Sequence, residues 1–164
     1  MLVFGAAGWN NERVTLTPPV ADDVRSAEDE VLDAVLGPSA PSRIRLLYSF
    51  VVLGSLVHDT SLLRDLFGGL TEIDDARAWP EDIFPPSVEV GGTLPGGARA
   101  RLVWHYLADY PAYRETVSVH HATGSMQVTF GTPYLLNAPT DLTVVDTASG
   151  GERRTIYRSR GESF

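Results

Sequence analysis

The residue with the clearest chemical potential in this chain is His58, because imidazole is the side chain whose charge changes near neutral pH. It lies in the segment GSLVHDTSLLRDLFG, from Gly54 to Gly68, which has the apolar spacing of a helix that ends at a glycine. A histidine on such a rigid element is a candidate general acid or base. The same pattern is typical of an ordinary core helix with one hydrogen-bonded histidine, so the pattern alone leaves both interpretations open.

Helical spacing decides which side chains accompany His58. Ser55 and Ser61 lie about one turn away on either side, whereas Asp59 points about 100° away around the helix axis. Asp59 is therefore a poor candidate for orienting the imidazole ring.

The composition limits which reactive groups this chain could use. The chain has no cysteine, and all 13 of its basic residues are arginine. Thiol nucleophiles, cysteine-bound zinc, iron–sulfur clusters and Schiff-base lysines are therefore excluded, and proton transfer falls to His, Asp, Glu or Tyr. The net charge of −8 argues against a nucleic-acid partner, because affinity for phosphates rests on Lys and Arg.

No export or membrane segment is predicted. The N-terminal MLVFGAAGWNNER has neither a basic region nor a long apolar run, so it does not resemble a signal peptide. The longest apolar run, from Ile44 to Val57, contains polar interruptions and is too short to cross a bilayer. We expect a cytoplasmic protein with no membrane partner.

The periodicity of the chain changes from helical to extended near Gly68. Helices are predicted over 21–36 and 42–67, a first strand over 13–17 and a linker over 71–86. Six further strands are predicted over 87–94, 98–107, 115–122, 126–131, 141–147 and 153–158. The fold class is therefore α+β: one domain over 1–164, with an open, mainly antiparallel sheet of about six strands and two helices packed on one face.

Alternation along the strands separates two faces of this sheet. Trp104 and Tyr106 point to one face of their strand and His105 to the other, while Val117 and Val119 share a face of the next strand. An open sheet face that carries Val and aromatic side chains needs a cover, and self-association is the simplest one. We expect a homodimer that forms through the open sheet face.

A metal site is a third possibility for the histidines. His120 and His121 are adjacent in one strand and point to opposite faces, so only one of them can join His105. No acidic residue obviously converges on the same point. No metal site is predicted.

Several segments together resemble a known family. GSLVHDTSLLRDLFG, WPEDIFPPSVEV, VWHYLADYPAYRE and GSMQVTFGTPYLLNAPTDLTVVD are similar to parts of the C-terminal domain of the glucose–fructose oxidoreductase/inositol dehydrogenase (Gfo/Idh/MocA) family. The resemblance covers about residues 40–164, and residues 1–40 diverge. It implies an open sheet that forms one wall of a substrate pocket and the oligomer interface.

The family's helix carries a DxxxHxxD-like pattern whose histidine serves as an acid or base. His58 matches that histidine, whereas Gly54 and Ser61 stand where the two aspartates are usual. In the family a separate N-terminal domain holds NAD or NADP, and no such domain precedes the match here. We therefore expect chemistry without a cofactor.

Two functions follow from the resemblance and the residues. The first is a stand-alone, cofactor-independent enzyme that isomerises, dehydrates or cyclises a small molecule. In it His58 is catalytic, and the substrate-binding residues are Ser61, Trp104, Tyr106, Tyr110 and Tyr113. The alternative is a non-catalytic ligand-binding or oligomerisation domain, or an excised fragment of an NAD(P)-dependent oxidoreductase. A closed cavity with His58 on its wall favours the enzyme, and an exposed apolar sheet face favours the alternative.

Overall fold

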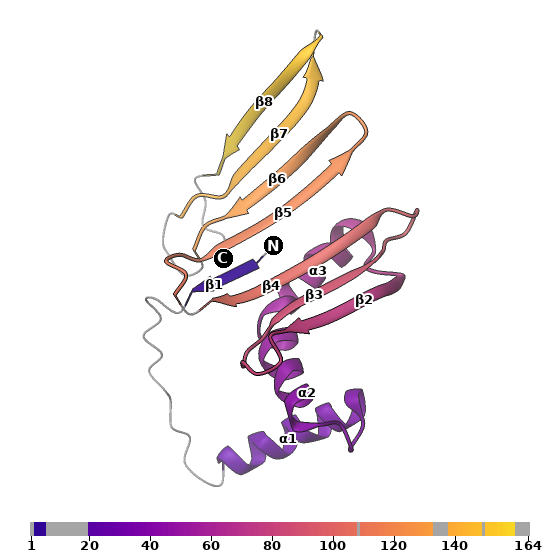
Figure 1. The fold of residues 1–164 in the computed structure, drawn as a ribbon, viewed down its shortest axis with the longest axis vertical. Coiled ribbons are helices and arrows are strands. Elements are labelled where there is room, and N and C mark those ends of the chain that lie inside the picture. Colours follow the sequence, from indigo (N-terminus) through magenta and orange to yellow (C-terminus); the bar gives the residue numbers. More distant parts are fainter. Residues whose placement is uncertain (1, 6–19, 108, 133–137, 149, 160–164) are drawn as a thin grey trace. The chain divides into compact units, whose positions relative to one another are not determined.

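The protein was examined as a computed structural model that describes residues 2–5, 20–107, 109–132, 138–148 and 150–159 (Figure 1). It combines helices in the first half with strands in the second, and the predicted α+β class is confirmed. The strand predicted over 13–17 lies outside the described residues.

The chain forms two compact units. The strand unit comprises Met1–Ala7, Ile73–Gly91 and Arg101–Phe164, and the helix unit comprises Gly8–Glu72 and Gly92–Ala100. The packing of the helices on one sheet face, and the assignment of 1–164 to a single domain, stay predictions.

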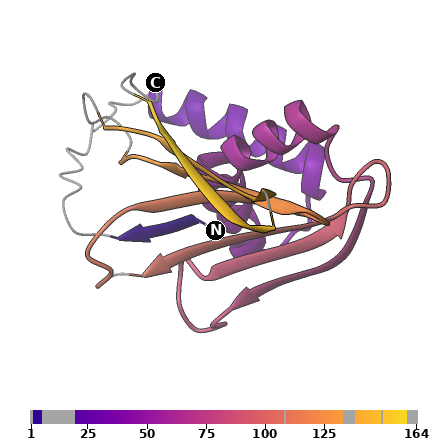
Figure 2. The same ribbon diagram turned by 90° about the horizontal axis from the view of Figure 1, so that it is seen from above.

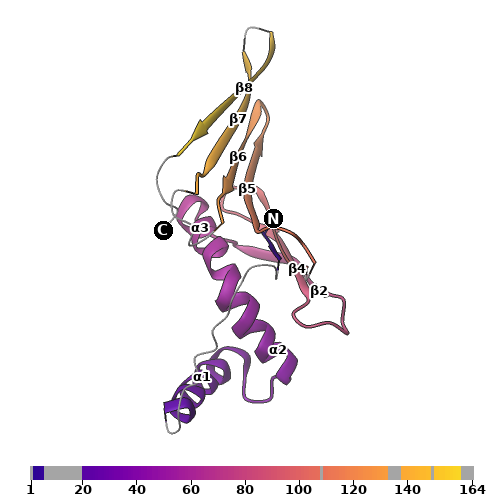
Figure 3. The ribbon, with the colours of Figure 1, turned by 90° about the vertical axis from the view of Figure 1, so that its left-hand side faces the viewer.

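The helix unit holds two helical rods. The first is α1 (Val20–Leu36), and the second runs without a break through α2 (Ser42–Leu47), η1 (Tyr48–Leu56) and α3 (Val57–Phe67) (Figure 3). The second rod has the predicted bounds, and its middle segment η1 is a π-helix. It ends where Gly68 adopts a left-handed conformation with φ of 83°, which a glycine reaches without strain.

Arg45 ties the start of the second rod to the end of α1. Its guanidinium donates to the carboxylate of Asp33 and lies 3.7 Å from that of Asp29. The same group reaches the backbone carbonyls of Gly37 and Pro38, at 3.3 and 3.4 Å. The helix unit also buries apolar side chains. Among the residues whose burial is described, these are Leu32, Val51, Leu56 and Leu94.

The strand unit contains two antiparallel groups of strands. One group is β2 (Glu72–Trp79), β3 (Ser87–Thr93) and β4 (Arg99–Leu107). The other is the meander β5 (Arg114–His121), β6 (Gly124–Phe130), β7 (Asp141–Ala148) and β8 (Gly151–Arg158). The short β1 (Leu2–Gly5) lies between the groups, parallel to β4 and antiparallel to β5 (Figures 1 and 2).

The strand order is thus β2-β3-β4-β1-β5-β6-β7-β8, which is eight strands where about six were predicted. The prediction of a linker over 71–86 is wrong in its first half, because β2 occupies Glu72–Trp79. Its sequence, EIDDARAW, has no apolar alternation, since Ile73 and Trp79 share their face with Asp75 and Arg77. An exposed edge strand of this kind leaves no hydrophobic pattern to detect.

Candidate functional site

His58 and Ser61 both lie on α3 with their side chains exposed. Within the part of the chain that the structure describes, no side chain holds the imidazole of His58 by a hydrogen bond. The interpretation of His58 as a hydrogen-bonded core histidine is therefore wrong for this structure. Its catalytic role stays a prediction.

The predicted aromatic residues belong to the strand unit. Trp104 is 1% exposed, and its ring stacks on that of Tyr106 with 6.4 Å between ring centroids. Tyr113 donates its hydroxyl to the carboxylate of Glu115 two residues on, and Tyr110 sits in the turn after β4, where its N–H bonds to the carbonyl of Leu107. Burial at this level makes Trp104 a core residue, as expected for a large ring in a sheet.

The residues predicted to share one site therefore divide into two sets. Trp104, Tyr106, Tyr110 and Tyr113 gather at one end of β4 and the start of β5, in the strand unit. His58 and Ser61, which lie on α3, belong to the helix unit. A joint site remains a prediction that the structure leaves open.

A second cluster, which the sequence did not predict, surrounds His105. Its Nδ1 lies 2.9 Å from the hydroxyl of the buried Ser87, and the Trp79 ring meets the imidazole edge-on at 5.6 Å between centroids. A serine and an imidazole at this distance resemble a nucleophile and its base. Ser87 is too buried for a substrate to reach, so we assign the cluster a structural role that fixes β2, β3 and β4 together.

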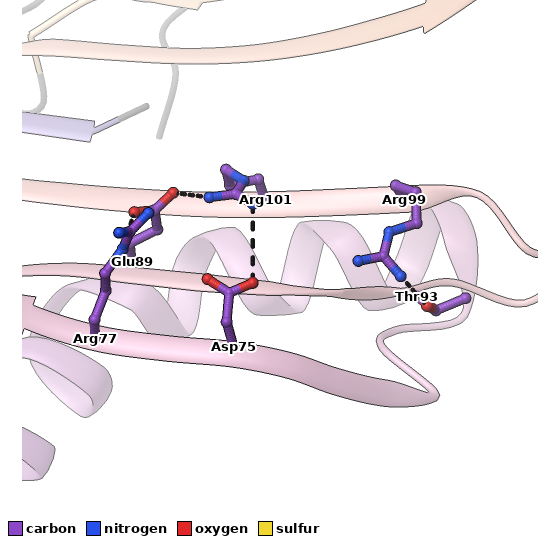
Figure 4. A network of polar contacts seen from close by, with 6 residues as sticks. All are labelled: Asp75, Arg77, Glu89, Thr93, Arg99 and Arg101. Carbon is purple, nitrogen blue, oxygen red and sulfur yellow. Dashed lines mark hydrogen bonds and ion pairs between the residues drawn. The ribbon is translucent and has the colours of Figure 1, made fainter.

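The most extensive polar cluster is an ion network on β2, β3 and β4 (Figure 4). Glu89, only 8% exposed, accepts from Nε of Arg77 at 2.7 Å and from Arg101, which also lies 3.8 Å from Asp75. Gly91 makes room for Asp75, since a Cβ built on it would lie 2.4 Å from the Oδ1 atom. A carboxylate with so little solvent is stable only because two guanidinium groups surround it.

These contacts shift the proton affinities of the network. Hydrogen bonds from Arg77 and then from Arg101 hold the pKa of Glu89 below its usual range, against a smaller opposing effect of burial. The hydrogen bond to Glu89 in turn raises the pKa of Arg101. Every charge in this cluster has a partner of opposite sign, which is typical of a structural network and not of an acid or base ready to react.

No group of three or more metal-ligating side chains forms among the described residues. His120 pairs with Ser125 and His121 with Gly124 in the ladder, so the two imidazoles lie on opposite faces of β5. His121 is engaged locally, with its Nδ1 3.2 Å from the Thr123 hydroxyl.

The register of the meander gives it two contrasting faces. On one face, Val117, Val128, Leu142 and Tyr157 form a row across all four strands, and Val119, Met126, Val144 and Thr155 form the next row. On the other face, the matching rows begin with Thr116, Ser118 and His120 and are mainly polar. We call the first face the apolar meander face. None of the residues in these four strands is buried, and Tyr157 is 58% exposed.

The second helical rod is also largely uncovered. By length and composition alone, the 26 residues of Ser42–Phe67 suffice to cross a membrane, and 11% of their most apolar window is buried. Core helices of soluble proteins meet the same criterion. The cytoplasmic location stays a prediction.

Comparison with protein families, with curated proteins and with solved structures finds no match to this chain. The resemblance to the Gfo/Idh/MocA C-terminal domain therefore stays a prediction from the sequence segments that carry it.

Proposed function

We propose that this chain is a non-catalytic assembly domain that forms a homodimer through the apolar meander face. The observation that carries the proposal is the pair of apolar rows across β5–β8, in which no side chain is buried and Met126 and Tyr157 are exposed. Large contiguous apolar patches on soluble proteins usually mark interaction sites.

The size of the face supports a second copy as its cover. Four strands about 4.8 Å apart and eight residues long span roughly 500 Å² in projection, and the two apolar rows make up about half of that area. A stable interface buries on the order of 800 Å² per partner, so one sheet face supplies most of that area. Two such faces can stack about 10 Å apart with interdigitated side chains, as sheets do in β-sandwiches.

Sedimentation velocity at micromolar concentration tests the proposal with two neighbouring residues of β7. Val144 lies on the apolar meander face, opposite Met126 of β6, and Thr143 lies on the polar face, opposite Gln127. Val144→Glu places a charge in the interface and is expected to dissociate the face-to-face dimer, because burying an unpaired carboxylate is costly. Thr143→Glu is the matched control and is expected to sediment as the dimer.

Two results contradict the proposal. Dimer dissociation by Thr143→Glu alone places the interface on the polar face, and a monomeric wild-type chain removes the interface altogether. Circular dichroism of both variants establishes that each still folds.

The enzyme remains the second candidate, and the exposed imidazole of His58 is the observation that favours it. An uncovered imidazole next to the exposed Ser61 is open to a substrate, as an acid or base must be. Imidazole resonances followed by NMR during titration with polyols, sugar acids and aromatic polyketide-like compounds test this role. A ligand that shifts the His58 signal, and that binds the His58→Ala variant more weakly, supports the enzyme, and an unchanged His58 signal throughout the panel counts against it.

A further inference from the structure

Strand β8 is the outermost strand of the meander, and it is almost entirely exposed. It follows β7 at the end of the strand order (Figure 1). Seven of its eight residues are exposed. Its sequence GERRTIYR leaves Ile156 and Tyr157 more than half exposed. An uncovered edge presents backbone N–H and C=O groups that can pair with another strand.

Two bidentate ion pairs hold β8 firmly on β7 and leave its outer edge available. Arg153 donates to both carboxylate oxygens of Asp146 at 2.9 and 2.6 Å, and Arg158 donates to both of Asp141 at 2.7 Å. The partners stand directly opposite each other in the ladder. The strand is therefore preformed, so that pairing on its outer edge requires little further ordering.

We propose that two copies of this chain pair their β8 strands antiparallel, about a two-fold axis at Thr155, so that the sheet continues from one copy into the other. This edge contact goes beyond the proposed face-to-face dimer and uses different atoms. The occupant is a second copy because the strand is complementary to itself in one register.

Symmetry restricts the registers of such a pair. An antiparallel edge contact requires a two-fold axis normal to the sheet, which keeps each side chain on its own face, so the axis must pass through a residue. Axes at Arg153 or Arg154 place an arginine opposite its own copy, and an axis at Ile156 places Arg154 opposite Arg158. Like charges directly opposite each other destabilise a strand pair.

The axis at Thr155 gives the opposite result. It pairs seven of the eight residues and places Glu152 opposite Arg158 twice, once on each side of the axis. Arg153 then faces Tyr157, and Arg154 faces Ile156, whose side chains accept the aliphatic and planar parts of arginine. Among the axes within β8 that align at least five residues, this is the one that opposes no two arginines.

A single introduced cysteine tests the register, because the chain has none of its own. In Thr155→Cys the two thiols meet on the axis with their Cα atoms about 4.5–5.5 Å apart, within the range of a disulfide. In Arg154→Cys the two Cα atoms lie about 8 Å apart across the pair, beyond that range. We expect Thr155→Cys to form covalent dimers under mild oxidation and Arg154→Cys to stay monomeric on a non-reducing gel.

Charge reversal provides the second measurement. Glu152→Arg in the Thr155→Cys background places arginines opposite each other and is expected to slow the initial rate of cross-linking about tenfold. Glu81→Arg in the same background is the matched control, because Glu81 is an exposed acid outside β8, and it is expected to leave the rate unchanged.

The same cysteine separates this proposal from the face-to-face dimer. Thr155 also lies on the apolar meander face, so Val144→Glu is combined with Thr155→Cys. Cross-linking that survives Val144→Glu supports the edge contact even if the face-to-face dimer does not exist. Three results would overturn the edge contact. Val144→Glu could abolish the cross-linking, Arg154→Cys could cross-link as well as Thr155→Cys, or Thr155→Cys could fail to cross-link. If Thr155→Cys does not cross-link, the arginines of β8 act to prevent this edge from pairing with another strand.

Discussion

Glu89 shows how a single charge organises three strands. It comes from β3 and receives Arg77 from β2 and Arg101 from β4, so its carboxylate links both neighbours (Figure 4). Removing one partner of such a group leaves the others with an unpaired charge. A substitution of Glu89 therefore costs free energy of folding at Arg77 and Arg101 as well, because their charges lose a partner.

We expect Glu89→Gln to lower the melting temperature at pH 7 by more than Glu81→Gln, its exposed control. The pKa of Glu89 is lowered in the folded state, so its stabilising effect is complete above the ordinary carboxyl value of 4.5 and is lost as the pH falls through the folded value. The difference in melting temperature between wild type and Glu89→Gln should shrink as the pH is lowered below 4.5. A difference that stays constant down to pH 2 would show that the charge contributes nothing.

Trp104 is the largest fully buried side chain among the described residues, and it tests the core of the strand unit. Truncation of a buried aromatic ring leaves a cavity and removes its transfer free energy. Trp104→Ala is expected to lower the free energy of unfolding in urea by about 3–5 kcal/mol. Ile73→Ala, at a side chain that is 63% exposed, should change it by less than about 0.5 kcal/mol. Similar losses for both would place Trp104 outside the core.

At the scale of elements, glycines set where the helices stop. Gly37 and Gly68 follow the two rods with φ of 84° and 83°, and both require the left-handed region. Their surroundings differ, because a Cβ on Gly68 would lie 3.1 Å from Cγ of Pro95, whereas a Cβ on Gly37 would meet no atom within 4 Å.

Alanine at the two positions should therefore cost different amounts. Gly37→Ala is expected to lower the free energy of unfolding by about 1 kcal/mol through backbone strain alone. Gly68→Ala carries the same strain and must also displace Pro95, so its loss should be larger. The free energies of unfolding of both variants are measured by urea denaturation. Equal losses would show that Pro95 is displaced without a cost in free energy.

The elements that sequence predicted well are those with a strong period. The long helix Ser42–Phe67 matches its prediction, and the strands of the meander lie within a few residues of their predicted bounds, because glycine turns and apolar alternation mark them. β2 was missed because charged side chains lie on both of its faces and interrupt the apolar alternation. The ion network was missed with it, since Asp75 and Arg77 belong to a strand that the pattern did not show.

The candidate site was harder to predict than the fold. Helical spacing alone left open whether His58 is buried, and exposure depends on contacts that neighbouring residues in sequence do not determine. Alternation did place His105 opposite Trp104, but its partner Ser87 comes from another strand, so the Ser87–His105 contact has no local signature.

At the scale of the whole molecule, self-association must appear in the thermodynamics of unfolding. The free energy that stabilises a dimer increases with protein concentration, by about 1.4 kcal/mol for each tenfold increase. Because that free energy is shared by two chains, each chain of 164 residues gains about 0.7 kcal/mol, which corresponds to a rise of roughly 1.5–3 °C in melting temperature. Differential scanning calorimetry at 5 and 50 µM should therefore give two different midpoints for the wild-type chain.

Val144→Glu distinguishes this behaviour from aggregation or instrument effects. A variant that cannot cover the apolar meander face loses the contribution of the face-to-face dimer, so its melting temperature should depend less on concentration than that of the wild type. Thr143→Glu, on the opposite face of the same strand, should keep the concentration dependence of the wild type. If all three chains melt independently of concentration, the meander face is open in solution, and the association that we propose does not contribute to the stability of the fold.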